Sequence, residues 1–107
     1  MSETYLPKPY VTFKEKHPQV AEAYEKLGET CHEAGPLPEA TRHLIKLGIA
    51  VAGQLSGGVK AHVRQALDAG ATQDEICHAI LLALTTSGFP SMIAALGWAN
   101  EVFSARP

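Results

Sequence analysis

The sequence predicts an all-α protein of about five helices that assembles into homo-oligomers. Apolar residues recur at intervals of three and four through most of the 107-residue chain, which is the period of a helix face. Proline and glycine fall between these segments, and no segment alternates like a strand. The length suits one domain rather than two independent cores. We therefore expect an N-terminal arm over residues 1–17 and a single helical domain over residues 18–107.

The N-terminal arm is predicted to be extended. Residues 1–17 hold Pro7 and Pro9 and show no sustained period, and proline removes a backbone donor while restricting its predecessor. Several apolar side chains in this stretch need cover, and we expect the arm to reach a neighbouring subunit. These side chains are Tyr5, Leu6, Tyr10, Val11 and Phe13.

The first two predicted helices carry apolar faces of different width. One begins at Pro18, ends before Gly35-Pro36 and has a single stripe, formed by Val20, Tyr24, Leu27, Cys31 and Ala34. The next begins near Pro38 and has a wide stripe, formed by Ala40, Leu44, Ile45, Leu47, Ile49, Val51, Ala52 and Leu55. A wide stripe indicates burial on more than one side. Ser56-Gly57-Gly58 is expected to break this second helix.

Capping signals delimit the remaining helices. A third helix runs from Val59 to Leu67, with Gly70 as its C-terminal cap. Thr72 and Glu75 form a capping box that starts a fourth helix, which ends around Gly88. Pro90 introduces a fifth, over residues 91–103.

The fifth helix supports the prediction of an oligomer. Residues 92–99, Met-Ile-Ala-Ala-Leu-Gly-Trp-Ala, include no charged side chain over two full turns, whereas a surface helix should show a polar face. A short chain cannot easily bury such a helix on all sides by itself. A homo-oligomer, in which small residues admit a neighbouring helix, accounts for this pattern better.

Composition excludes several classes of function. The formal net charge is −2 with both signs interspersed, so nucleic acid is not an expected partner. No apolar run reaches the roughly 18 residues of a membrane span, and the N-terminus lacks a signal peptide. Cys31 and Cys77 make no disulfide framework, so a cytoplasmic location is expected. The sequence contains no phosphate loop, nucleophile elbow or zinc spacing, and neither a cofactor nor a metal is predicted.

Two histidines are the candidates for chemistry. His62 lies on the apolar stripe of the third helix, and His43 borders the buried face of the second. These two helices should pack as a hairpin, so the two imidazoles could line one cleft and act as acid, base or proton relay near neutral pH. The alternative for His62 is a structural histidine at the edge of the core, with its ring nitrogens held by hydrogen bonds. The cysteines fall on apolar stripes, where inert structural cysteines usually lie.

Three segments carry a resemblance to a known family. GPLPEATRHLIKLGIAVA (35–52), HVRQALDAGATQDEICHAILLAL (62–84) and GFPSMIAAL (88–96) resemble, in that order, the carboxymuconolactone decarboxylase and alkylhydroperoxidase D (AhpD-like) superfamily. The resemblance spans about two-thirds of the chain. It implies an all-helical fold and assembly as trimers or hexamers.

The same resemblance separates two kinds of activity. Peroxidatic members carry a Cys-x-x-Cys pair, an upstream glutamate and a histidine. The matching positions here are Leu55 and Gly58 for the cysteines, His43 for the glutamate and His62 for the histidine. The thiolate is the nucleophile of such a peroxidase, so its absence disfavours peroxide reduction. The decarboxylase branch does not need the cysteines.

Three functional hypotheses follow. The first is lactone or decarboxylase-type chemistry on a small molecule by His62 and His43, with Lys60 and Arg64 as neighbours that could bind an anion. The second is alkylhydroperoxidase or peroxiredoxin-type activity that uses other residues, such as Cys31 or Cys77. The third is a catalytically silent oligomer that binds a ligand or a partner.

Overall fold

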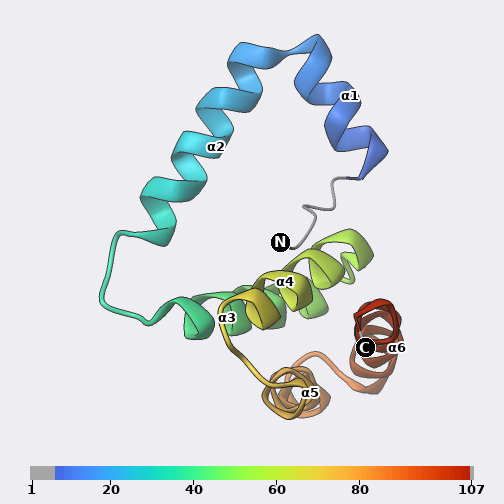
Figure 1. The fold of residues 1–107 in the computed structure, drawn as a ribbon. Coiled ribbons are helices and arrows are strands. Elements are labelled where there is room, and N and C mark those ends of the chain that lie inside the picture. The colour runs from blue at the N-terminus through green and yellow to red at the C-terminus, as the bar shows by residue number, and fades with distance from the viewer. Residues whose placement is uncertain (1–6, 107) are drawn as a thin grey trace. The chain divides into compact units, whose positions relative to one another are not determined.

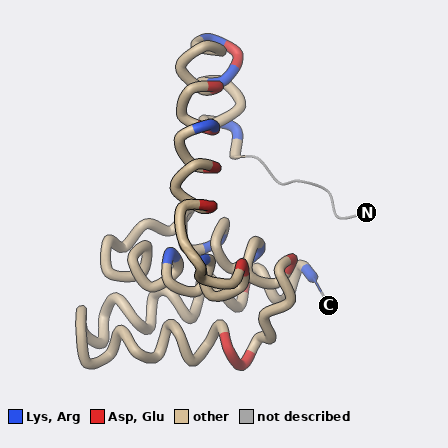
Figure 2. The backbone as a smooth tube through the Cα atoms, turned by 90° about the vertical axis from the view of Figure 1, so that its left-hand side faces the viewer, with Lys and Arg blue, Asp and Glu red and all other residues tan. Residues whose placement is uncertain are grey.

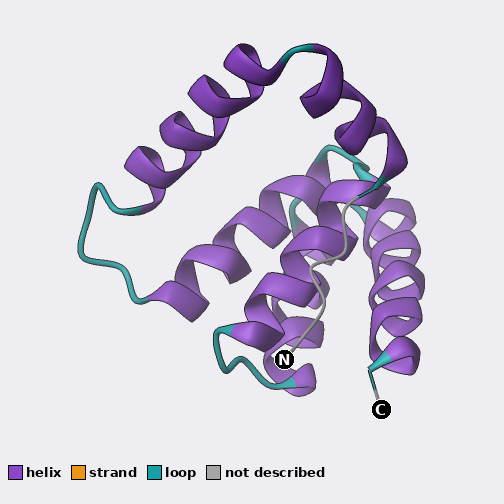
Figure 3. Ribbon diagram, turned by 45° about the horizontal axis from the view of Figure 1, so that its top comes forward, coloured by secondary structure: helices purple, strands orange, loops and turns teal. Residues whose placement is uncertain are grey.

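The computed structural model describes residues 7–106, and every regular element in that range is a helix (Figure 3). This confirms the predicted all-α class. Contacts between residues divide the chain into two compact units, Met1–Pro36 and Leu37–Pro107. The units are described separately below.

The first unit contains α1 (Lys8–Lys16) and α2 (Pro18–His32). The prediction of an extended arm is therefore wrong for most of residues 7–17. Pro7 caps α1 and Pro9 lies in its first turn, where a missing backbone N–H leaves no hydrogen bond unmade. Residues 1–6, which include Tyr5 and Leu6, lie outside the described part of the chain.

A glutamate joins the two helices of this unit. The Tyr10 hydroxyl donates a hydrogen bond of 2.9 Å to Oε2 of Glu25, and Nζ of Lys14 lies 3.1 Å from the same oxygen. The Phe13 ring packs near His17, at the junction of the helices, with ring centroids 5.9 Å apart. A shared acceptor on α2 thus holds two side chains of α1.

Helix α2 has an apolar stripe that its own unit does not cover. Among its residues only Ala21 is buried. Val20, Tyr24 and Leu27 are 58%, 64% and 59% exposed, although their spacing places them on one face. We call these three residues the α2 stripe.

The second unit is a small helical domain around a continuous core. It comprises α3 (Glu39–Ala52), α4 (Ser56–Asp68), α5 (Gln73–Leu81), the 3-10 helix η1 (Leu82–Thr85) and α6 (Phe89–Ala105). Helices α3 and α4 lie side by side as a hairpin, and α5 and α6 pack against them (Figure 1). The largest fully buried side chains are Leu47, Val51, Val59, Val63, Ile76 and Ile80.

The turn between α3 and α4 differs from the predicted one. Ser56, Gly57 and Gly58 form the first turn of α4 rather than a break. The chain reverses three residues earlier, where Gln54 adopts a left-handed φ of 54°. Its amide N–H bonds to the Val51 carbonyl and the next N–H to the Ala50 carbonyl, a Schellman motif in which glycine is the usual residue.

The other predicted caps are confirmed. Gly70 has a φ of +98° after α4, and the amides of Gly70 and Ala71 bond to the carbonyls of Leu67 and Ala66. Thr72 and Glu75 make both hydrogen bonds of the capping box that starts α5. The predicted fourth helix continues as η1 through Thr85.

Helix α6 is covered by its own unit along one face only. It contacts α3, α4, α5 and η1, and its buried residues are Ser91, Met92, Ala95, Ala99 and Val102. On the other face Ile93 is 48% exposed. Charged residues are sparse along this unit (Figure 2). The subunit therefore accounts for part of the apolar pattern of α6, and homo-oligomerisation stays a prediction.

Candidate functional site

His43 and His62 lie next to each other across the α3–α4 hairpin. Their ring centroids are 6.1 Å apart, with an angle of 35° between the planes. Both residues are half-buried, and the Nδ1 atom of each ring is buried. The antiparallel packing of α3 on α4 brings together two imidazoles that are 19 positions apart in the sequence. Two imidazoles this close can serve one bound molecule jointly as acid and base near neutral pH.

The histidine pair lies one turn from the N-terminus of α4. Leu55 is the N-cap residue and Gly58 lies in the first turn, four positions before His62 and on the same face. A Cβ atom at Gly58 would lie 3.4 Å from the Cβ atoms of Ala50 and Leu55, which is ordinary van der Waals contact. The two positions that match the family's cysteine pair thus flank the positive end of a helix dipole.

The Lys60 side chain and the Arg64 carbonyl of α4 both contact residues at the end of α6. Nζ of Lys60 lies 3.4 Å from Oε2 of Glu101 on α6. The carbonyl oxygen of Arg64 accepts a hydrogen bond from Arg106, which also pairs with Asp68 at 2.7 Å. These ion pairs tie α4 to the C-terminal end of α6. Lys60 thus forms an ion pair with α6, and its role in binding an anion stays a prediction.

The setting of Cys77 makes its thiol less reactive than a free one. Cys77 is half-buried on α5, and burial raises the pKa of its thiol, with a further increase from the nearby Asp74 carboxylate. A raised pKa leaves less thiolate at neutral pH and lowers reactivity. Cys31 is an exposed residue of α2 in the first unit. No group of three or more metal-ligating side chains occurs within residues 7–106.

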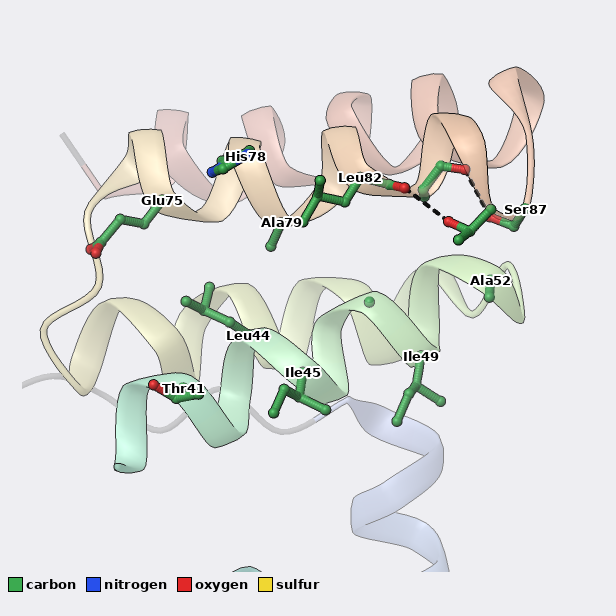
Figure 4. A pocket seen from close by; sticks show the side chains of 13 residues that line it. Thr41, Leu44, Ile45, Ile49, Ala52, Glu75, His78, Ala79, Leu82 and Ser87 are labelled. Carbon is green, nitrogen blue, oxygen red and sulfur yellow. Dashed lines mark hydrogen bonds between the residues drawn. The ribbon is translucent and has the colours of Figure 1, made fainter. Parts of the chain in front are cut away.

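A groove of about 660 Å³ separates α3 from α5 and η1 (Figure 4). Its walls are mostly apolar, and no pattern in the sequence predicted it. His43 and His62 do not line the groove. Gly48 does line it, and His43 lies five positions away on the same helix, so the two residues face directions about 140° apart. The lining residues are Thr41, Leu44, Ile45, Gly48, Ile49, Ala52, Glu75, His78, Ala79, Leu82, Ala83, Thr86 and Ser87.

The polar groups at the two ends of the groove are largely engaged with the backbone. Oε1 of Glu75 accepts the Thr72 amide at 2.8 Å. The hydroxyls of Thr86 and Ser87 donate to the carbonyls of Leu82 and Ala83, as the dashed lines in Figure 4 show. Between these ends the walls expose large apolar side chains: Ile45 is 47%, Leu82 59% and Ile49 67% exposed. The groove thus favours an apolar occupant over a polar substrate.

Comparisons with known proteins identify the family. The model of the carboxymuconolactone decarboxylase family matches residues 18–101. No curated protein matches the chain. Within residues 7–106 no helix is long and apolar enough to cross a membrane.

Two solved structures share the fold. One is an apo carboxymuconolactone decarboxylase family protein from Legionella pneumophila, with a TM-score of 0.77 at 26% identity over 89% of this chain and 84% of the other. The second, from Burkholderia xenovorans LB400, is described as a carboxymuconolactone decarboxylase whose assignment is unconfirmed. Its TM-score is 0.75 at 27% identity over 94% of this chain and 81% of the other. With the family model matching most of its length, this chain belongs to the carboxymuconolactone decarboxylase family.

Proposed function

We propose that this protein is a carboxymuconolactone decarboxylase/AhpD-like enzyme that acts on a small molecule by histidine-based acid/base chemistry. The observation that carries the proposal is the apposition of His43 and His62, with ring centroids 6.1 Å apart. His62 is the general acid or base, and His43 is its proton partner. The substrate class is a lactone or another compound with a carboxylate next to the reacting carbon.

The chemistry requires one proton shared by two bases. Two imidazolium cations this close repel each other, which disfavours the state with a proton on both rings, and the proposed cycle uses the state with a proton on one of them. The neutral ring then removes a proton from the substrate, and the protonated ring returns one to the carbon or oxygen that develops charge. The cycle needs no thiol, which suits a chain with Leu55 and Gly58 at the cysteine positions.

Conservative variants test this proposal. His62→Gln and His43→Gln keep a polar side chain of similar reach but cannot cycle a proton. Wild type and variants are offered γ-lactones and β-keto acids, and lactone absorbance and carbon dioxide release are recorded. We expect turnover by the wild type, a loss of at least a hundredfold in His62→Gln, and little change in His78→Gln, an exposed histidine of the groove. Equal turnover in all four proteins would contradict the roles of both histidines.

Peroxiredoxin-type activity is the second candidate, supported by the likeness to AhpD-like proteins. It would need a thiolate, and the raised pKa of Cys77 makes that residue a poor source. The test is intact mass before and after an organic hydroperoxide, with peroxide consumption followed under a thiol reductant. Loss of two protons or gain of one oxygen, with turnover, would establish this activity. An unchanged mass without turnover would exclude it.

A catalytically silent protein is the third candidate, favoured by the missing cysteine pair. It would bind a small ligand or partner and give no turnover in either assay. In all three cases we propose a cytoplasmic homo-oligomer, a trimer or a hexamer. The family resemblance and the exposed apolar side chains of α2, α3 and η1 support assembly. The mass of the native protein in solution, measured by light scattering, tests it.

A further inference from the structure

We propose that the groove between α3 and α5–η1 receives the α2 stripe of a second copy of this chain. This inference rests on the homo-oligomer proposed above and adds the two surfaces that form it. An amphipathic helix in an apolar groove is a recurrent mode of recognition, with anchors one turn apart. Val20, Tyr24 and Leu27 have the spacing of such anchors.

The dimensions of the two surfaces agree. The α3 wall of the groove runs from Thr41 to Ala52, which corresponds to about 16 Å of helix. The α2 stripe occupies about 10 Å of its helix, so all three side chains fit within the groove. Ala23 and Gly28 flank the stripe on either side, and a Cβ atom added at Gly28 would meet nothing within 4 Å. Small flanking residues allow the two walls to approach α2 closely.

The exposed apolar area of the two surfaces is also large enough for a specific interface. The three stripe side chains and Ile45, Ile49 and Leu82 are each about half to two-thirds exposed. Together they present roughly 500 Å² of apolar surface. Where two copies exchange their α2 helices, the two reciprocal contacts bury roughly 1,000 Å², the lower bound for a stable interface, and three such pairs make the proposed hexamer. One kind of contact thus covers both large exposed apolar surfaces.

Complementary charge variants test the contact. Ile49→Glu places a carboxylate in the groove, and Leu27→Lys places an ammonium on the stripe; both wild-type side chains are exposed, so neither change disturbs a core. Each variant alone should raise the dissociation constant of the assembly at least tenfold, measured by sedimentation equilibrium, with unchanged helical circular dichroism. An equimolar mixture should recover the wild-type mass, because the lysine of one copy then enters the groove that holds the glutamate of the other.

Control variants separate this interface from others. Ile93→Glu makes the same change at a similarly exposed isoleucine on α6, outside the groove, and Glu29→Lys places a lysine on the opposite side of α2. Both should keep the wild-type mass. Gly48→Leu, where an added Cβ meets nothing within 4 Å, should fill the groove and dissociate the assembly without a charge.

Every other outcome overturns the proposal. If the wild type is monomeric, no second copy covers the groove. If Ile49→Glu keeps the wild-type mass, the groove is not the interface. If Leu27→Lys keeps the assembly while Ile49→Glu dissociates it, another segment occupies the groove. If Ile93→Glu dissociates it while Ile49→Glu does not, the exposed face of α6 is the interface. Failure of the substrate assays leaves these masses unchanged, so the proposed activity and the proposed interface fail independently.

Discussion

Gln54 donates a hydrogen bond of 3.2 Å from Nε2 to the hydroxyl of Ser91, 37 residues further along the chain. Gln54 has the only positive φ of a non-glycine residue in the part of the chain that the structure describes. Ser91 is buried in the first turn of α6. The bond therefore ties the strained turn before α4, and with it the start of the helix that carries His62, to the C-terminal helix.

Substitutions at Gln54 should separate backbone strain from the hydrogen bond. Gln54→Val loses the bond and puts a β-branched residue in the left-handed region, so we expect the free energy of unfolding to fall by about 2 kcal/mol. Gln54→Gly also loses the bond but relieves about 1 kcal/mol of strain, so it should stay within about 0.5 kcal/mol of wild type. Urea denaturation measures both. Equal losses in the two variants would show that the turn stores no strain.

The capping box of α5 should behave as a coupled pair. Thr72→Ala removes the acceptor for the Glu75 amide and should cost about 1 kcal/mol of stability. Glu75→Ala removes the acceptor for the Thr72 amide. Because each side chain orients the other, the double variant should lose less than the sum of the single losses. Strict additivity in denaturation experiments would argue against a reciprocal box in solution.

The contact between α1 and α2 should depend on pH through Glu25. The Tyr10 hydroxyl, and then Lys14, donate to its carboxylate and hold the pKa of Glu25 below the ordinary 4.5. A lowered pKa in the folded state means that this stabilisation is complete above pH 4.5 and is lost as the pH falls through the folded value. A carbon-13 titration of the Glu25 carboxyl should give a midpoint below 4.5, and Tyr10→Phe should move it upward. An unchanged midpoint in Tyr10→Phe would remove the hydroxyl as the cause.

The contact between α1 and α2 should also weaken at high pH. The hydrogen bond to Glu25 raises the pKa of Tyr10 above 10.0 and that of Lys14 above 10.5. Raised values in the folded state mean that the stabilisation is present below pH 10 and is lost as the pH rises through them. Ultraviolet titration of tyrosine should show a phenol that ionises later than the others. In Glu25→Gln this late phenol should disappear.

Cysteines introduced at positions 55 and 58 should reveal whether this fold supports peroxide chemistry. Leu55→Cys with Gly58→Cys places thiols at the N-terminus of α4, where the helix dipole favours the thiolate, one turn before His62. We expect this double variant to consume an organic hydroperoxide with a dithiol reductant, at least tenfold faster than wild type. Adding His62→Gln should reduce the rate. The matched Leu55→Ser, Gly58→Ser protein serves as the control, and equal rates in it would attribute the consumption to the reductant alone.

Local sequence signals predicted most helix boundaries, but they missed helix α1 and misplaced the turn before α4. The capping box at Thr72 and the cap at Gly70 are local devices, so the sequence was sufficient for them. Pro7 and Pro9 were interpreted as helix-breaking, although prolines at the start of a helix are tolerated, and α1 was missed. The glycines at 57 and 58 suggested a break, but Gln54 makes the turn, because a bond to the distant Ser91 holds a conformation that glutamine rarely adopts.

At the candidate site, the sequence predicted contacts between neighbouring helices but not those that depend on distant parts of the chain. The facing of His43 and His62 follows from hairpin packing of two adjacent helices, so the two sequence positions were enough to expect it. The groove depends on how far α5 and η1 stand from α3, a distance set by core packing that no local pattern encodes. Likewise Glu101, the partner of Lys60, lies on α6, 41 positions away.

The near absence of buried residues in α2 has a consequence for the protein during its synthesis and turnover. Residues 7–36 leave the ribosome before the residues of the second unit, and among them only Ala21 is buried even in the finished chain. A hairpin with so little core opens readily, and its apolar stripe is then accessible to chaperones and proteases. If a second copy covers that stripe, dilution would shorten the lifetime of the chain in the cell, and accumulation would lengthen it.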